Sequence, residues 1–95
     1  MHDPKPSAVR QVRKGLGMTQ DRLAEASGLK DRTRIASIEA GRIKARSPEV
    51  RRGLAQGFGL SLDQIDALLA GDLSPADAIA VANPPPPPPK HGEAA

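Results

Sequence analysis

The chain has 95 residues, one aromatic residue and no cysteine, and its net charge of +3 divides into +7 over residues 1–56 and −4 over residues 57–95. This length allows one small domain with an aliphatic core, and the lack of cysteine excludes disulfides and thiolate metal sites. The longest apolar run, residues 78–82, is too short to span a bilayer, and no signal-peptide pattern opens the sequence, so we expect a cytoplasmic protein with no membrane partner.

Helix-boundary residues and apolar residues at helical spacing predict five short helices within residues 7–71, after a disordered lead over residues 1–6. The expected first residues or N-caps are, in chain order, Ser7, Thr19, Asp31, Ser47 and Ser61, the last forming a capping-box pattern with Gln64. The expected apolar faces are Val9, Val12 and Leu16; Leu23 and Ala24; Ile35 and Ile38; Val50, Leu54 and Phe58; and Leu62, Ile65, Leu68 and Leu69. Without any strand pattern, these helices predict an all-α domain.

Two segments are predicted after the helix-turn-helix domain, a possible short helix and a tail. Ser74 and Pro75 could begin one more short helix within residues 72–82. Six consecutive prolines follow, so residues 83–95 are expected to form a disordered tail of polyproline II character. As an alternative, the proline run followed by Lys90 could dock in an aromatic groove of another protein.

Residues 19–41 read TQDRLAEASGLKDRTRIASIEAG, preceded by VRKGLGM and followed by a basic loop and SPEVRRGLAQGFGLSLDQI. The informative positions are Thr19-Gln20, Leu23-Ala24, Gly28 and the Ile38-Glu39-x-Gly41 ending. Together and in this order they resemble the Xre/Cro family of phage-repressor-like helix-turn-helix domains over about residues 9–66. The resemblance implies a five-helix repressor-like fold whose helix at about residues 31–40 reads the major groove of DNA.

The spacing after the turn glycine departs from that family. Six steps separate Leu29 from Ile35, where the family usually has five. Either the turn is one residue longer, or the helix begins earlier and bulges. The spacing from Ile35 through Ile38 to Glu39 is kept, so the helix itself is expected in both cases.

Three residues are expected to read bases. With Ile35 and Ile38 buried, the outer face of the helix carries Arg32, Thr33 and Ser37. Arginine can donate two hydrogen bonds to guanine, and threonine has a methyl group that suits thymine. Phosphate contacts are expected from Gln20, Lys30, Arg34, Arg42, Lys44 and Arg46. The resemblance also implies a structural ion pair between Arg13 and Glu39.

We therefore predict a nucleoid-associated repressor that binds specific double-stranded DNA sequences. A homodimer is expected through surplus apolar residues of the acidic half: Leu62, Leu68, Leu69, Ile79 and Val81. Enzyme activity, a cofactor and a metal are not expected, because His2 and His91 lie in the predicted disordered ends and no nucleophile or ligand cluster is visible. The alternatives are an antitoxin that binds a toxin protein and regulates its own operon, and an interaction adaptor with the same fold.

Overall fold

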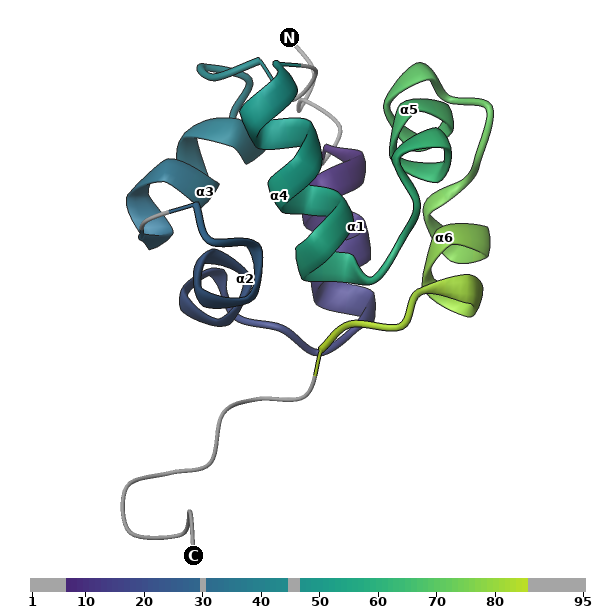
Figure 1. Ribbon diagram of the computed structural model, residues 1–95, viewed down its shortest axis with the longest axis horizontal. Coiled ribbons are helices and arrows are strands. Elements are labelled where there is room, and N and C mark those ends of the chain that lie inside the picture. Colours follow the sequence, from purple (N-terminus) through teal and green to yellow (C-terminus); the bar gives the residue numbers. More distant parts are fainter. Residues whose placement is uncertain (1–6, 30, 45–46, 86–95) are drawn as a thin grey trace, which may run out of the picture.

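Six helices make up the part of the protein described by the structure, a computed structural model that covers residues 7–29, 31–44 and 47–85 (Figure 1). They are α1 (Ala8–Gly15), α2 (Gln20–Ser27), α3 (Arg32–Glu39), α4 (Pro48–Phe58), α5 (Leu62–Ala70) and α6 (Pro75–Val81). These residues contain no strand, so the all-α class predicted from the sequence is confirmed. None of the described helices is long and apolar enough to cross a membrane.

Polar side chains cap the helices largely where the sequence predicts. Ser7, Thr19 and Asp31 each accept a hydrogen bond from a backbone N–H in the first turn of α1, α2 and α3, at 3.1, 3.0 and 3.1 Å. At α5 both halves of the capping box form: the N–H of Gln64 donates to Ser61 Oγ at 3.0 Å, and the N–H of Ser61 donates to Gln64 Oε1 at 2.8 Å. Each cap satisfies a backbone donor that the helix cannot satisfy itself, and so fixes where the helix begins.

The start of α4 differs from this pattern. Pro48 is its first residue, and the preceding Ser47, which the sequence predicts as the boundary residue, does not cap the helix with its side chain. The Ser47 hydroxyl instead donates to the carbonyl of Lys44 at 3.0 Å. It therefore stabilises the end of the loop between α3 and α4 rather than the first turn of α4.

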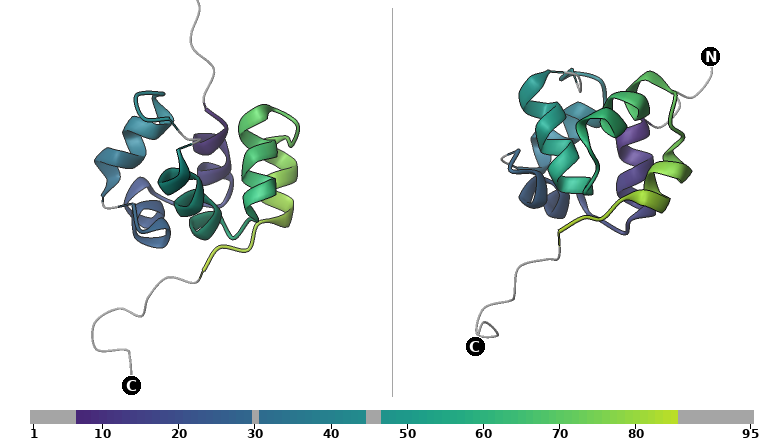
Figure 2. Two further views of the ribbon diagram at one scale, coloured as in Figure 1. Left: turned by 45° about the horizontal axis from the view of Figure 1, so that its top comes forward. Right: turned by 45° about the vertical axis from the view of Figure 1, so that its right-hand side comes forward.

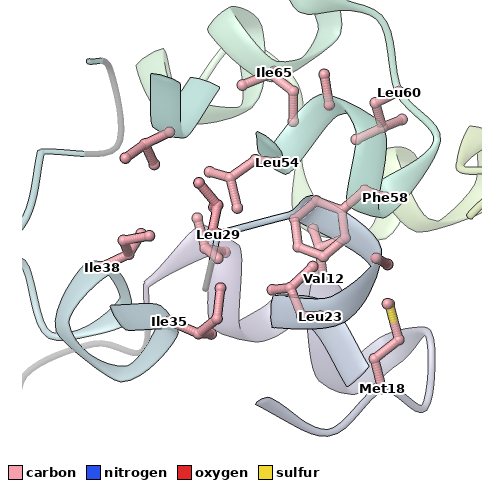
Figure 3. Packing of buried hydrophobic residues seen from close by; sticks show 14 of the residues in the cluster. Val12, Met18, Leu23, Leu29, Ile35, Ile38, Leu54, Phe58, Leu60 and Ile65 are labelled. Atoms are coloured by element: carbon pink, nitrogen blue, oxygen red, sulfur yellow. The ribbon is translucent and has the colours of Figure 1, made fainter. Parts of the chain in front are cut away.

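Aliphatic side chains from several helices form one core around Phe58 (Figure 3). Leu23 of α2, Ile35 of α3, Leu54 of α4 and Ile65 of α5 are, like Phe58, fully buried. Burying a side chain of this size contributes about 1.5–3 kcal/mol relative to leaving it exposed. The positions of α2 and α3, which matter for the functional site, are thus set by side chains that also hold α4 and α5.

Two glycines of α4 allow it to lie close to α2 and to the turn that follows α2. A side-chain carbon at Gly53 would lie 2.7 Å from Cγ of Leu29, and one at Gly57 would lie 2.8 Å from Cδ1 of Leu23. Carbon atoms do not approach so closely without displacement, so a side chain at either position would displace Leu29 or Leu23. Glycine is otherwise unfavourable inside a helix, and its presence here follows from the packing.

The short helix predicted within residues 72–82 is present as α6, and it packs against the domain. Ala78 is fully buried, and the N–H of Asn83 donates to the carbonyl of Gly59 at 3.2 Å. The predicted domain end at residue 71 is therefore too early, since α6 and residues 83–85 belong to the folded unit. Local pattern could not show this, because it depends on contacts with α1 and α4. Outside the described residues lie the predicted lead, residues 1–6, and the rest of the predicted tail, residues 86–95.

The apolar surplus predicted in the acidic half is mostly used inside the protein. Leu68 is buried, and Leu69 and Ile79 are half-buried against the core. Among the described residues the exposed large hydrophobic side chains are Leu62 and Val81, which are 38% and 53% exposed. The surface predicted for a homodimer contact is correspondingly smaller than the sequence indicated.

The two charged halves of the chain lie on different sides of the molecule. The helix α3 lies on one side and the α5–α6 pair on the other, with α1 and α4 between them (Figures 1 and 2). Four exposed carboxylates belong to α5, α6 and their connection: Asp63, Asp66, Asp72 and Asp77. Residues 62–81 contain no lysine or arginine, so the α5–α6 side is acidic, whereas the cations lie on the remaining elements, α3 among them.

Candidate nucleic-acid interface

The additional residue between Leu29 and Ile35 belongs to the turn between α2 and α3. Gly28 ends α2 in the left-handed conformation, with φ of 70°, and its N–H donates to the carbonyl of Ala24. The N–H of Asp31 then donates to the carbonyl of Leu29 at 3.1 Å, and the Asp31 side chain caps α3. From Arg32 onward α3 is a regular α-helix. Of the two alternatives, the longer turn is therefore correct, and the helix does not bulge.

The predicted base-reading residues lie on the outer side of α3. Ile35 and Ile38 are 0% and 4% exposed, and they hold the inner side of the helix in the core. Arg32 and Thr33, in the first turn, are exposed, while Ser37, one turn further, is half-buried. The first turn of α3 is thus presented to the solvent by a helix that cannot rotate without uncovering two isoleucines.

A buried ion pair joins α1 to the end of α3, as the family resemblance implies. Arg13 Nε donates to Glu39 Oε2 at 2.5 Å, and Arg13 Nη2 donates to Glu39 Oε1 at 3.2 Å. The side chains are 9% and 6% exposed. Arg13 Nη1 also donates to the carbonyl of Met18 at 2.9 Å, and Gln20 Nε2 donates to Glu39 Oε1 at 3.2 Å. This network fixes α3 relative to α1 and to the first residue of α2.

Two further arginines of α3 have carboxylate neighbours on adjacent helices. Arg32 Nη1 lies 3.9 Å from Asp21 Oδ2 of α2, and both side chains are about 70% exposed, so this contact is weak. Arg34 Nη2 forms an ion pair and hydrogen bond with Glu49 Oε1 in the first turn of α4. Neither of these two contacts can be read from spacing along the chain, because each depends on how two helices pack.

The loop after α3 is fastened to the helix by its backbone. The carbonyl of Ser37 accepts hydrogen bonds from the N–H of Arg42 at 2.8 Å and of Ile43 at 3.3 Å. Ile43 is half-buried against the core, whereas Arg42 and Lys44 are exposed. The two cations are therefore carried next to the C-terminal end of α3 by a loop with a fixed course. Two other predicted contact residues, Lys30 and Arg46, lie outside the described residues.

Together these elements form a basic surface that runs along α3 from its first turn to the loop after its C-terminal end. It has a polar residue at the start of α2, outward side chains on α3, and cations in the following loop: Gln20, Arg32, Thr33, Arg34, Ser37, Arg42 and Lys44. Within residues 7–29, 31–44 and 47–85, no group of three His, Asp or Glu side chains could hold a metal ion. An exposed helix flanked by cations is suited to a groove lined with phosphates.

Comparison with known proteins agrees with this geometry. Residues 9–65, more than half of the chain, match the helix-turn-helix family. No curated protein and no solved structure gives a significant match. The matched region contains α1 without its first residue, α2 to α4 and the first part of α5, including every residue of the basic surface. The chain therefore belongs to the helix-turn-helix family of the Xre/Cro type, whose members bind DNA and regulate transcription.

Proposed function

We propose that the protein is a repressor that recognises a specific double-stranded DNA sequence by placing α3 in the major groove. The observation that carries the proposal is the outward display of Arg32 and Thr33 from a helix whose inner side is held by Ile35 and Ile38. An α-helix with its side chains is about as wide as the major groove, which is about 12 Å across. Occupying a site in the chromosomal DNA of the nucleoid would exclude other proteins from it, which is the physical basis of repression.

The first turn of α3 has the chemistry that base reading needs. Arg32 offers two parallel N–H donors that match the O6 and N7 acceptors of guanine, and Thr33 offers a hydroxyl and a methyl group. Ser37 lies one turn further along the same helix, where a half-buried hydroxyl reaches fewer positions. We therefore assign most of the sequence preference to Arg32 and Thr33.

The flanking residues of the basic surface are proposed to bind phosphates. Gln20 is the first residue of α2, where backbone N–H groups favour an anion. Arg42 and Lys44 follow α3, and Arg34 lies on its side facing α4. Lys30 and Arg46 are included on sequence grounds alone. These contacts set the register of α3 on the duplex and carry no sequence information themselves.

Selection of bound fragments from random duplex DNA tests the proposal directly. Arg32→Ala and Thr33→Ala are each expected to relax the preference at one or two base positions of the selected motif. Each change should cost about 1–3 kcal/mol of discrimination at its position, because a specific donor or methyl contact is lost. Competition binding with single-base variants of the selected site measures this discrimination.

Arg51→Ala provides a matched control for the charge that Arg32→Ala removes. Arg51 forms an ion pair with Asp66 at 3.0 Å, on the side of α4 that faces α5, so its removal should leave the selected motif unchanged. If both α3 variants select the same motif as the original protein, α3 is not the reading helix and the proposal fails.

We further propose that two copies bind together on an inverted repeat. One helix-turn-helix buries little surface on DNA, and pairing two domains about 34–36 Å apart, one helical turn, doubles the contact. The exposed Leu62 and Val81 belong to α5 and α6, the pair of helices away from α3, and are suited to such a contact. Sedimentation should show a concentration-dependent dimer that Leu62→Asp or Val81→Asp weakens by about 1–2 kcal/mol. A strictly monomeric protein with an asymmetric selected motif would contradict this proposal.

A further inference from the structure

The ion pair between Arg34 and Glu49 lies at the edge of the basic surface. Arg34 is the third residue of α3, and Glu49 is the second residue of α4. Their side chains are 27% and 69% exposed, so the carboxylate is largely in solvent while the guanidinium rests against the protein. A pair as exposed as this contributes little to stability. The ion pair lies next to the proposed DNA contacts, so its main effect is expected to be on DNA binding.

Helix geometry places Arg34 toward a wall of the groove. Arg34 directly precedes the buried Ile35, and successive residues are separated by about 100° around an α-helix. Arg34 therefore lies on a flank of α3, next to the outward Thr33, and its ion pair with Glu49 shows that this flank faces α4. A helix seated in the major groove has a phosphate backbone along each flank. Arg34, and Glu49 with it, would then face one of these two backbones.

A carboxylate and a phosphate compete for the same guanidinium. Both are anions with oxygen acceptors that match the N–H donors of arginine. While Glu49 holds Arg34, the pair is close to neutral and attracts DNA only weakly. If Glu49 stays beside the phosphates after Arg34 has left it, its own charge is repelled by them. Glu49 therefore opposes DNA binding in both arrangements.

We propose that Glu49 occupies, within the protein, the place of a DNA phosphate on Arg34, and that it thereby limits the affinity for DNA. The inference rests on the proposed function and adds to it a residue that restrains binding. Its effect acts through Arg34 and not merely through the negative charge. It applies to specific and unrelated duplexes alike, because the ligand is the phosphodiester backbone common to both.

The test compares the original protein with Glu49→Gln on a selected site and on an unrelated duplex, over a range of salt concentrations. Glu49→Gln is expected to tighten binding to both by about fivefold at about 0.1 M salt, as one cation becomes available. The slope of log affinity against log salt should steepen by about 0.9, the value for one more phosphate contact. Arg42→Ala, which removes one exposed cation, gives the opposite change of slope for comparison.

Asp66→Asn is the matched control, because it also removes one carboxylate from an arginine pair, but on the acidic side of the molecule. It should leave the slope unchanged. Thermal melting of each variant verifies that it is folded. An unchanged slope and affinity for Glu49→Gln would overturn the proposal.

The double variant Arg34→Gln/Glu49→Gln separates release of Arg34 from simple charge repulsion. The gain from Glu49→Gln should become much smaller when Arg34 is already replaced, because only the repulsion between Glu49 and the phosphates then remains to be removed. A gain of the same size without Arg34 would show that Glu49 acts through its charge alone, and the proposal would be wrong. If the original protein binds neither duplex at any salt concentration, the proposed function fails, which is a distinct result.

Discussion

Arg13→Met is expected to lower the free energy of unfolding by about 3–5 kcal/mol, because it leaves the Glu39 carboxylate buried without its partner. Glu39 is 6% exposed and would retain only the hydrogen bond from Gln20. The carbonyl of Met18 would also lose the donor that now lies 2.9 Å away. The total free energy of unfolding of such a domain is about 5–15 kcal/mol, so the loss should be evident in urea denaturation.

Two variants serve as controls for this effect. Arg32→Met removes the same side chain from a contact whose partners are about 70% exposed, and it should change the stability by less than about 0.5 kcal/mol. The double variant Arg13→Met/Glu39→Met removes both charges and should recover most of the loss. Equal losses for Arg13→Met and Arg32→Met would contradict the structural importance of the pair.

The ion pair between Arg13 and Glu39 should also affect DNA recognition. Its partners join α1 to the C-terminal end of α3, and Gln20 extends the network to the start of α2. The orientation of α3 in the groove therefore depends on it. We expect Arg13→Met to weaken discrimination between base sequences even under conditions in which the variant is fully folded.

Features that depend on neighbouring residues were predictable from the sequence. Ser61 and Gln64 are three residues apart, and that spacing alone determines a capping box. Asp31 likewise marks the start of α3, and Ile35 and Ile38 mark its buried side. Once the buried side of α3 is known, its opposite side must face the solvent. The α3 part of the basic surface follows from this.

Features that depend on distant contacts were not predictable. Gly53 and Gly57 look like weak points in a helix, and their purpose is visible only when Leu29 and Leu23 lie against them. The pairing of Arg34 with Glu49 depends on the course of the loop between α3 and α4, for which the sequence gives only composition. The choice between a longer turn and a bulged helix likewise required coordinates.

The position of α6 is the largest such case, and it makes truncation informative. Ile79 of α6 lies directly over Gly15 of α1, where any side-chain carbon would overlap it. Beyond the helix, the N–H of Asn83 donates a hydrogen bond to the carbonyl of Gly59, and Arg22 Nη2 donates to the carbonyl of Pro85 at 2.8 Å. The C-terminal segment is thus fastened to α1, to α2 and to the end of α4.

A protein truncated after Gly71 is expected to lose about 3–5 kcal/mol of stability, because the buried side of α1 becomes exposed and the apolar contacts of Ala78 and Ile79 are lost. Truncation after Pro85 keeps all of these contacts and should leave the midpoint of urea denaturation unchanged. A loss that is the same for both truncations would assign the effect to residues 86–95 and contradict the role of α6.

Two point substitutions separate packing from chain length. Ile79→Ala should cost about 1–2 kcal/mol, since the half-buried Ile79 packs against the core, whereas Val81→Ala should cost less than about 0.5 kcal/mol, since Val81 is 53% exposed. Because α6 and α3 lie on opposite sides of the domain, the fraction of Ile79→Ala that remains folded should select the same DNA motif as the original protein. If the folded variant selects a different DNA motif, then α6 influences α3, and this expectation is wrong.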